Sequence, residues 1–230
     1  MSKTYLLLYS LASAAGWAYV LAICLKSIAM GTISTLWDEV NPALKIVQTA
    51  ACLEVIHSLI GIVRSSWVTS LMQVFSRVWT LWACMNIAPP AQTSIFFTLA
   101  CTSWALVEVP RYLFYGLNLL DTVPYPLFWL RYSLFAVLYP TGITGEVGCM
   151  YHAGRFLQDS KLYVWGKPFL DVPNIQISMI ENLEVSLLLL IIIVAVTYIP
   201  GSPVMYGHMV KTRKKQFQAY KEGKVEKKGK

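Results

Sequence analysis

A tyrosine and a glutamate stand out in this sequence because both lie in a long apolar segment, where ionisable groups are rare and usually paired or functional. Tyr139 and Glu146 are seven residues apart, about two turns of an α-helix, and would share a face if the helix is continuous. A phenol and a carboxylate that face one cavity can act as a general acid and a general base. The same spacing fits a kinked helix with an interfacial tyrosine equally well.

The stretch between these two residues is unusual for an apolar span. It contains Pro140, Gly142 and Gly145. Non-helical backbone at membrane depth is tolerated only where protein or a wet cavity covers it. The sequence therefore marks this stretch as the most distinctive part of the chain, and leaves open whether Tyr139 and Glu146 lie on one continuous helix.

Other ionisable side chains also fall within apolar segments. Glu108 and Arg111 are three residues apart, so a helix places them on one face, within reach of an ion pair. An interhelical polar network is favoured for this group, with direct ligand contact as the alternative. Glu146 has no cation nearby in the sequence and is the most suggestive chemical group. The network candidates are Glu54, Arg77, Glu108, Arg111 and Arg131.

Several catalytic patterns are missing. His57, His152 and His208 form no HxxxH or HxxHH cluster, which excludes a histidine-box di-iron enzyme. No glycine-rich phosphate loop follows a strand. The stretch from His57 to Arg64 imitates the HCxxGxxR loop of cysteine phosphatases, but serine replaces the cysteine, so no thiolate nucleophile can form. We therefore expect neither a metal nor a cofactor.

Composition indicates a membrane protein. Of 230 residues, 56% are hydrophobic and 13% charged, whereas soluble domains carry about 25% charged residues. The formal charge of +7 does not indicate nucleic acid, because residues 1–210 contain ten basic and ten acidic residues and the last twenty carry the whole excess. Five cysteines, all in apolar segments, indicate packing residues rather than disulfides.

We expect an all-α, polytopic membrane bundle of six transmembrane helices, since a span needs roughly 20 mostly apolar residues. Its basic C-terminal tail, residues 207–230, is expected in the cytosol, and an even number of spans places the N-terminus there too. The membrane domain is expected over residues 1–206. The six segments are Tyr5–Leu25, Ala43–Val63, Trp67–Ile87, Ser94–Leu117, Leu127–Met150 and Leu183–Val204.

Several blocks resemble one known family. The stretch from Leu130 to Glu146 is similar to the signature of very-long-chain (3R)-3-hydroxyacyl-CoA dehydratases, also called protein-tyrosine-phosphatase-like A proteins. Glu108–Tyr112 and Cys52–Ser65 resemble two further blocks, and Gln73–Arg77 continues the latter. The blocks occur in order over nearly the whole membrane region.

This resemblance implies a lyase without a cofactor, which removes water from a 3-hydroxyacyl-CoA to give a trans-2-enoyl-CoA in microsomal fatty-acid elongation. The family's catalytic pair falls on Tyr139 and Glu146, and either residue can be the acid or the base. Its supporting polar positions fall on Glu54, Gln73, Arg77, Glu108, Arg111, Arg131 and Gly142.

The expected partners are the 3-hydroxyacyl-CoA substrate, membrane lipid and other enzymes of the elongation cycle, and no nucleic acid. Lys227-Lys-Gly-Lys230 fits a dilysine retrieval signal, so we expect a multi-pass protein of the endoplasmic-reticulum membrane. Two other functions stay open. A small membrane transporter also fits intramembrane charges and a broken span, although no internal repeat is seen. A catalytically inactive membrane interaction protein is the second.

Overall fold

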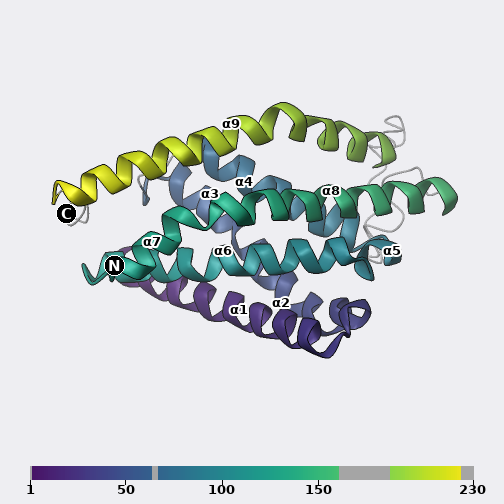
Figure 1. Cartoon of the computed structure of the whole chain (residues 1–230), viewed down its shortest axis with the longest axis horizontal. Helices are drawn as coiled ribbons and strands as arrows, with labels where there is room; N and C mark the ends of the chain where they lie inside the picture. The colour runs from purple at the N-terminus through teal and green to yellow at the C-terminus, as the bar shows by residue number, and fades with distance from the viewer. Residues whose placement is uncertain (1, 64–66, 161–186, 224–230) are drawn as a thin grey trace.

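The computed structural model describes residues 2–63, 67–160 and 187–223, and all the regular structure in these ranges is helical. Figure 1 shows an elongated bundle in which the longer helices run along the long axis. The expected all-α class is confirmed. The elements are α1 (Ser2–Met30), η1 (Ile33–Thr35), α2 (Leu36–Ala50), α3 (Cys52–Leu59), α4 (Trp67–Trp79), η2 (Thr80–Met85), α5 (Pro89–Gln92), α6 (Ile95–Leu119), α7 (Tyr125–Ser133), α8 (Phe135–Ser160) and α9 (Leu187–Lys221).

Helix α6 forms the centre of the bundle, with α1 against one side and α8 against the other (Figure 1). Its buried face is rich in small side chains, which let neighbouring helices approach closely. Cys101 on this face lies against Cys24 of α1, with 3.4 Å between the two sulfurs, and both thiols are free. The cysteines therefore contribute packing here, as expected.

Local sequence signals set the helix ends. Gly31 follows α1 with φ of 68°, and the Thr32 amide donates to the Ser27 carbonyl at 2.9 Å, which is the pattern of a Schellman cap. At the start of α6, the Ser94 hydroxyl accepts from the Phe97 amide at 3.2 Å. This contact satisfies one of the free amides at the helix N-terminus.

Three of the six expected segments differ from single regular helices. Residues 43–63 are divided between α2 and α3, and α3 ends at Leu59, before Gly61 with φ of 75°. Residues 67–87 begin as α4 and continue as the π-helical turn η2. Residues 127–150 are divided between α7 and α8 at Leu134.

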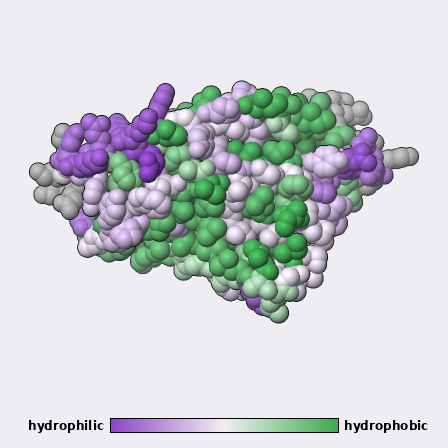
Figure 2. Space-filling model, viewed as in Figure 1, coloured by the Kyte–Doolittle hydropathy of each residue, from purple (hydrophilic) through white to green (hydrophobic). Residues whose placement is uncertain are grey.

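Two described helices are long and apolar enough to cross a membrane by themselves, over Lys3–Met30 and Leu187–Lys221. Only 11% of the most apolar stretch of α9 is buried, so its aliphatic side chains face outward. Figure 2 shows apolar residues across the middle of the visible face and hydrophilic residues at both ends. This distribution fits a protein surrounded by lipid.

The other described helices are too short, or too low in mean hydropathy, to qualify as membrane spans, and the reason is physical. Helices α2, α3, α4 and α7 have 15 residues or fewer. Helix α6 is long enough but includes Glu108 and Arg111, and α8 includes Glu146 and several small polar residues. The polar residues that the interior requires lower the hydropathy of the helices that carry them. By hydropathy and length, two of the described helices qualify as membrane-spanning, so the expected six spans are not confirmed.

Candidate active site

Helix α8 carries both members of the expected catalytic pair. It runs without a break from Phe135 to Ser160, so Tyr139 and Glu146 lie on one helix although Pro140 and two glycines lie between them. The break in this region is at Leu134, before the pair and not between its members. The question that the sequence left open is thus answered by a continuous helix.

Glu146 is buried and held by two hydrogen-bond donors from different helices. Trp104 Nε1 of α6 donates to Oε1 at 2.8 Å. The Tyr198 hydroxyl of α9 donates to Oε2. Among the described residues, no basic side chain forms an ion pair with this carboxylate. Glu146 is therefore a buried carboxylate oriented by neutral groups, which fits a group that must exchange a proton.

Tyr139 lies on the same side of α8, against α9. Its hydroxyl is 3.5 Å from the Ser202 carbonyl oxygen, at the outer limit of a hydrogen bond, and its ring is 6.1 Å from that of Tyr206. The structure shows no direct hydrogen bond between Tyr139 and Glu146. Helix α9 thus covers both residues, with Tyr198 opposite Glu146 and Ser202 one turn later opposite Tyr139.

Four of the polar residues expected in a network form one connected cluster. Glu108 accepts from Arg77 of α4, and its other oxygen is 2.9 Å from Arg111 Nε on its own helix. Arg111 also pairs with Glu54 of α3, which in turn accepts from the Tyr112 hydroxyl. Two positive and two negative groups join α3, α4 and α6, so the cluster is neutral overall. Such balance is needed because an unpaired charge is very costly in a buried site.

The other expected positions lie outside this cluster. Arg131 of α7 donates to the Tyr115 hydroxyl at 3.1 Å and lies over the rings of Tyr115 and Tyr132. Gln73 contributes its backbone carbonyl to Arg77 Nε at 3.3 Å. Gly142 is buried on α8 facing Ser103. These three residues therefore support neighbouring side chains or helix packing in different places.

The backbones of α6 and α8 approach each other closely at Gly145. A Cβ atom added there would lie 2.5 Å from the Ala100 backbone nitrogen, far inside normal contact, whereas one added at Gly142 would meet Ser103 at an ordinary 3.7 Å. Gly145 therefore allows the two backbones to touch directly beside Glu146. This close approach brings Trp104, one turn after Ala100, within hydrogen-bond distance of the carboxylate.

Sequence analysis did not single out Trp104, Tyr198 or Gly145 as site residues. The tyrosine follows Glu146 by 52 residues, and nothing in its local sequence marks it as a partner. An aromatic residue on an apolar segment is usually a packing residue. Only their hydrogen bonds to Glu146 distinguish Trp104 and Tyr198 from such packing residues. One signal was present in the sequence: Glu146 has no basic residue nearby. A buried carboxylate without a cation needs neutral hydrogen-bond donors instead.

The phosphatase-like segment has structural roles. A ring nitrogen of His57 is 2.9 Å from the Tyr5 hydroxyl. The Ser58 hydroxyl donates to the backbone carbonyls of Glu54 and Val55 at 3.0 Å. Arg64 lies outside the described residues. The serine at the position of the missing cysteine is therefore engaged with its own helix.

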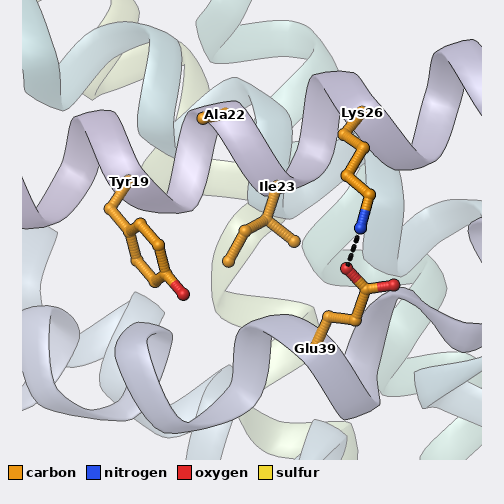
Figure 3. Close-up of a pocket in the computed structure, with 5 residues that line it drawn as sticks. All are labelled: Tyr19, Ala22, Ile23, Lys26 and Glu39. Carbon is orange, nitrogen blue, oxygen red and sulfur yellow. Dashed lines mark hydrogen bonds and ion pairs between the residues drawn. The ribbon is translucent and has the colours of Figure 1, made fainter.

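A surface hollow of about 380 Å³ lies between α1 and α2 (Figure 3). Figure 3 shows Lys26 and Glu39 joined across it, with 3.0 Å between Nζ and Oε2, and the side chains of Tyr19, Ala22 and Ile23 along the α1 side. Tyr139 and Glu146 instead face α6 and α9. The hollow is thus separate from the candidate active site.

Together, the outward-facing apolar helices and the buried ionisable centre define an all-helical membrane protein. A family described as "Protein tyrosine phosphatase-like protein, PTPLA" matches residues 48–219. The chain belongs to this family, which confirms the resemblance found in the sequence. No solved structure gives a significant match.

Curated relatives share most of the chain and carry one activity in their names. A Caenorhabditis elegans protein named very-long-chain (3R)-3-hydroxyacyl-CoA dehydratase hpo-8 is 39% identical, over 93% of this chain and 94% of its own. The Arabidopsis thaliana protein named very-long-chain (3R)-3-hydroxyacyl-CoA dehydratase PASTICCINO 2 is 35% identical, over 93% of this chain and 92% of its own. The human dehydratase 2 is 34% identical, over 94% of this chain and 81% of its own.

Proposed function

We propose that this protein is a very-long-chain (3R)-3-hydroxyacyl-CoA dehydratase, a hydro-lyase that forms a trans-2-enoyl-CoA in fatty-acid elongation. The near full-length similarity to proteins of that name supports the activity. The observation that carries the site assignment is the state of Glu146. It is a buried carboxylate held by Trp104 and Tyr198, whereas the buried Glu108 is neutralised by arginines.

In the proposed reaction, Glu146 takes the proton from C2 of the substrate, beside the thioester. The electrons of that C–H bond form the C2–C3 double bond as the C3–O bond breaks. Tyr139 donates its phenolic proton to the departing hydroxyl, which leaves as water. Return of the proton from Glu146 to the phenolate restores both groups, so the reaction balances without an external reagent. The opposite assignment of acid and base uses the same two side chains.

Access to Glu146 in this scheme comes from the α9 side. Trp104 is buried in the bundle core, and its bond to Oε1 fixes the plane of the carboxylate. Tyr198 is only partly buried, so a substrate can approach the carboxylate beside it while its bond to Oε2 is kept. Tyr139 is held weakly, so its hydroxyl is free to turn toward a substrate. The acyl chain would then lie in the apolar region along α8 and α9.

The charged cluster is proposed to support the site rather than to react. Its members bind one another across α3, α4 and α6, and the same α6 carries Trp104. Because each charge has a partner of opposite sign, its removal would leave another charge buried and unpaired. The cluster therefore fixes the position of α6 relative to α4 and α3, and Trp104 moves with that helix.

The finer membrane topology is also part of the proposal. Six crossings would be made by α1, α2–α3, α4–η2, α6, α7–α8 and α9, which gives residues 1–206 as the catalytic domain and residues 207–230 as a basic cytosolic tail. The start of α1 and the end of α9 lie at the same end of the bundle in Figure 1, as an even number of crossings requires. Helix α9 crosses residue 206 without a break, so the proposed boundary separates membrane from cytosol rather than two folded units.

We place the protein in the endoplasmic-reticulum membrane, where it would contact lipid and other enzymes of the elongation cycle. The dilysine pattern that suggests retrieval lies outside the described residues. Attachment of a glycosylation acceptor site to either terminus tests the topology, because only a lumenal acceptor is modified. Modification at the C-terminus would contradict the proposed orientation.

The decisive experiment is turnover by the purified protein. Wild type in lipid nanodiscs should convert a long-chain (3R)-3-hydroxyacyl-CoA to the enoyl-CoA, which mass spectrometry detects. Tyr139→Phe and Glu146→Gln should each abolish turnover while the protein remains folded. Glu39→Gln, at an exposed ion pair on α2, and Tyr151→Phe, at an exposed ring on α8, serve as matched controls.

Two results would contradict different parts of the proposal. Absence of enoyl product from folded wild type would refute the activity itself. Full activity of both Tyr139→Phe and Glu146→Gln beside an active wild type would refute the site and leave the activity in place.

A further inference from the structure

One face of α9 runs past both halves of the candidate active site and continues toward the basic end of the helix. Tyr198 contacts Glu146, and Ser202 and Tyr206 contact Tyr139. Arg213 lies seven residues after Tyr206, on the same helical face. This face therefore forms a continuous seam between α9 and the α7–α8 pair, with the candidate catalytic residues at one end and Arg213 at the other.

Arg213 is held in place but not neutralised. Its Nε donates to the Ser133 hydroxyl of α7 at 3.2 Å, and its guanidinium lies 4.6 Å from the centre of the Phe217 ring. Within the described ranges it forms no ion pair with a carboxylate. Only one of its five N–H groups is used in that bond, so the guanidinium keeps donors in the fork arrangement that suits phosphate.

Aromatic packing makes this end of the seam rigid. Phe128 of α7 lies 5.1 Å from the ring of Phe217 and 4.8 Å from that of Tyr220, both on α9. These contacts hold α7 and α9 together one and two turns beyond Arg213. The side chain is therefore preorganised, which lowers the entropy lost when it binds an anion.

The surroundings of Arg213 are electropositive and outside the expected hydrocarbon region. Lys211, Lys214 and Lys215 are exposed on neighbouring faces of α9. At 1.5 Å per residue, the 35 residues of α9 reach about 52 Å, well beyond the ~30 Å hydrocarbon thickness of a bilayer. The basic part of α9 thus extends into water, where an anionic headgroup can approach it.

The distance along α9 matches the length of the CoA arm. Ser202, opposite Tyr139, and Arg213 are eleven residues apart, or about 16 Å along a helix. The pantetheine arm between the thioester and the diphosphate is about as long as five extended residues, which is roughly 17 Å. A thioester beside Tyr139 and Glu146 would therefore place its phosphates at Arg213.

We propose that Arg213 binds a phosphate group of the CoA moiety, with the α7–α9 seam as the path of the pantetheine arm. This assignment rests on the proposed dehydratase function, since it takes the position of the thioester from that site. Binding energy at Arg213 is then used to hold the substrate, and not in the elimination step itself. Loss of this contact should raise KM for the CoA thioester and leave kcat nearly unchanged.

The test compares a CoA thioester with its pantetheine thioester, which lacks the phosphates and the adenosine of CoA. Arg213→Gln should raise KM for a 3-hydroxyacyl-CoA by about tenfold or more, the usual effect of a lost charge-assisted hydrogen bond. It should have little effect on the matching 3-hydroxyacyl-pantetheine, which has no phosphates. Lys214→Gln removes the same charge one residue further on, from an exposed face, and is the matched control.

Direct binding separates this inference from the proposed function. Free CoA is titrated into the folded protein and binding is measured by calorimetry. Wild type and Lys214→Gln should bind CoA with the same affinity. Arg213→Gln should bind CoA about tenfold or more weakly, like its effect on KM. If wild type binds CoA in this way but forms no enoyl product, the proposed function fails while the phosphate site stands. Equal CoA affinity and equal KM for wild type and Arg213→Gln would overturn the site.

A lipid phosphate is the other source of the same chemistry. In nanodiscs of phosphatidylcholine alone, the effect of Arg213→Gln on the CoA substrate should persist. An effect seen only with added anionic phospholipid, and equal for the CoA and pantetheine substrates, would assign Arg213 to a lipid headgroup and overturn the proposal.

Discussion

Replacement of Gly145 by alanine is expected to lower both stability and activity, because this residue sets the spacing between α6 and α8. The added Cβ would lie 2.5 Å from the backbone nitrogen and 2.8 Å from the Cα of Ala100, whereas ordinary contact begins at 3.4 Å. The helices would have to separate locally by about 0.9 Å to reach that distance. A backbone atom cannot rotate away as a side-chain end can.

The expected magnitudes follow from this displacement. Overpacking of a tightly packed interior typically costs about 1–3 kcal/mol, and the better helix propensity of alanine offsets about 1 kcal/mol of it. The same displacement acts on the 2.8 Å bond from Trp104 to Glu146, since the two residues lie on the separated helices. A shift near 1 Å at a reacting group can reduce the rate about 100-fold.

The assay measures kcat in nanodiscs together with thermal unfolding in detergent. Gly154→Ala is the matched control on α8, because its Cβ would meet only the end of the Leu188 side chain at 3.5 Å. A second substitution, Ala100→Gly, should not rescue Gly145→Ala, because the clash involves backbone atoms. Wild-type activity and stability of Gly145→Ala would refute the reasoning.

Two further results are expected. Tyr198→Phe should lower kcat about tenfold or more without a large change in KM, because it removes one hydrogen bond to Glu146 but keeps the ring; an unchanged kcat would make Tyr198 a packing residue only. Glu108→Gln should destabilise the protein by about 3–5 kcal/mol in thermal unfolding, and by more than Glu54→Gln, because Glu108 is paired with both arginines. Its side chain is 2% exposed, compared with 16% for Glu54, and equal losses for the two variants would contradict this ranking.

Local sequence periodicity accounts for the parts of the site that lie within one helix. Glu108 and Arg111 are three residues apart, and their side chains are 2.9 Å apart in the structure. Tyr139 and Glu146 are likewise on one side of α8, against α9. Neighbours at three, four or seven residues follow from helix geometry, so the first relation was predictable, and the second was predictable on the condition that the helix is continuous.

Relations between helices were not predictable in the same way. Hydropathy identifies an apolar segment but does not specify its rotation about its own axis or its distance from a neighbour. Glu54 and Arg77 meet the α6 charges only because α3 and α4 present these faces to it. Likewise, Gly142 and Gly145 look alike in the sequence, and only the packing of α6 makes the second one indispensable for close approach.

The sequence by itself determined that this is an all-helical membrane protein of the PTPLA family, because apolar composition, helical spacing and ordered motifs are properties of the chain. The tertiary structure alone decided how Glu146 is held. Its two donors, Trp104 and Tyr198, are 42 and 52 residues away in the sequence. A buried carboxylate must satisfy both oxygens, and in a helical bundle its partners come from whichever helices pack against it, which no local pattern records.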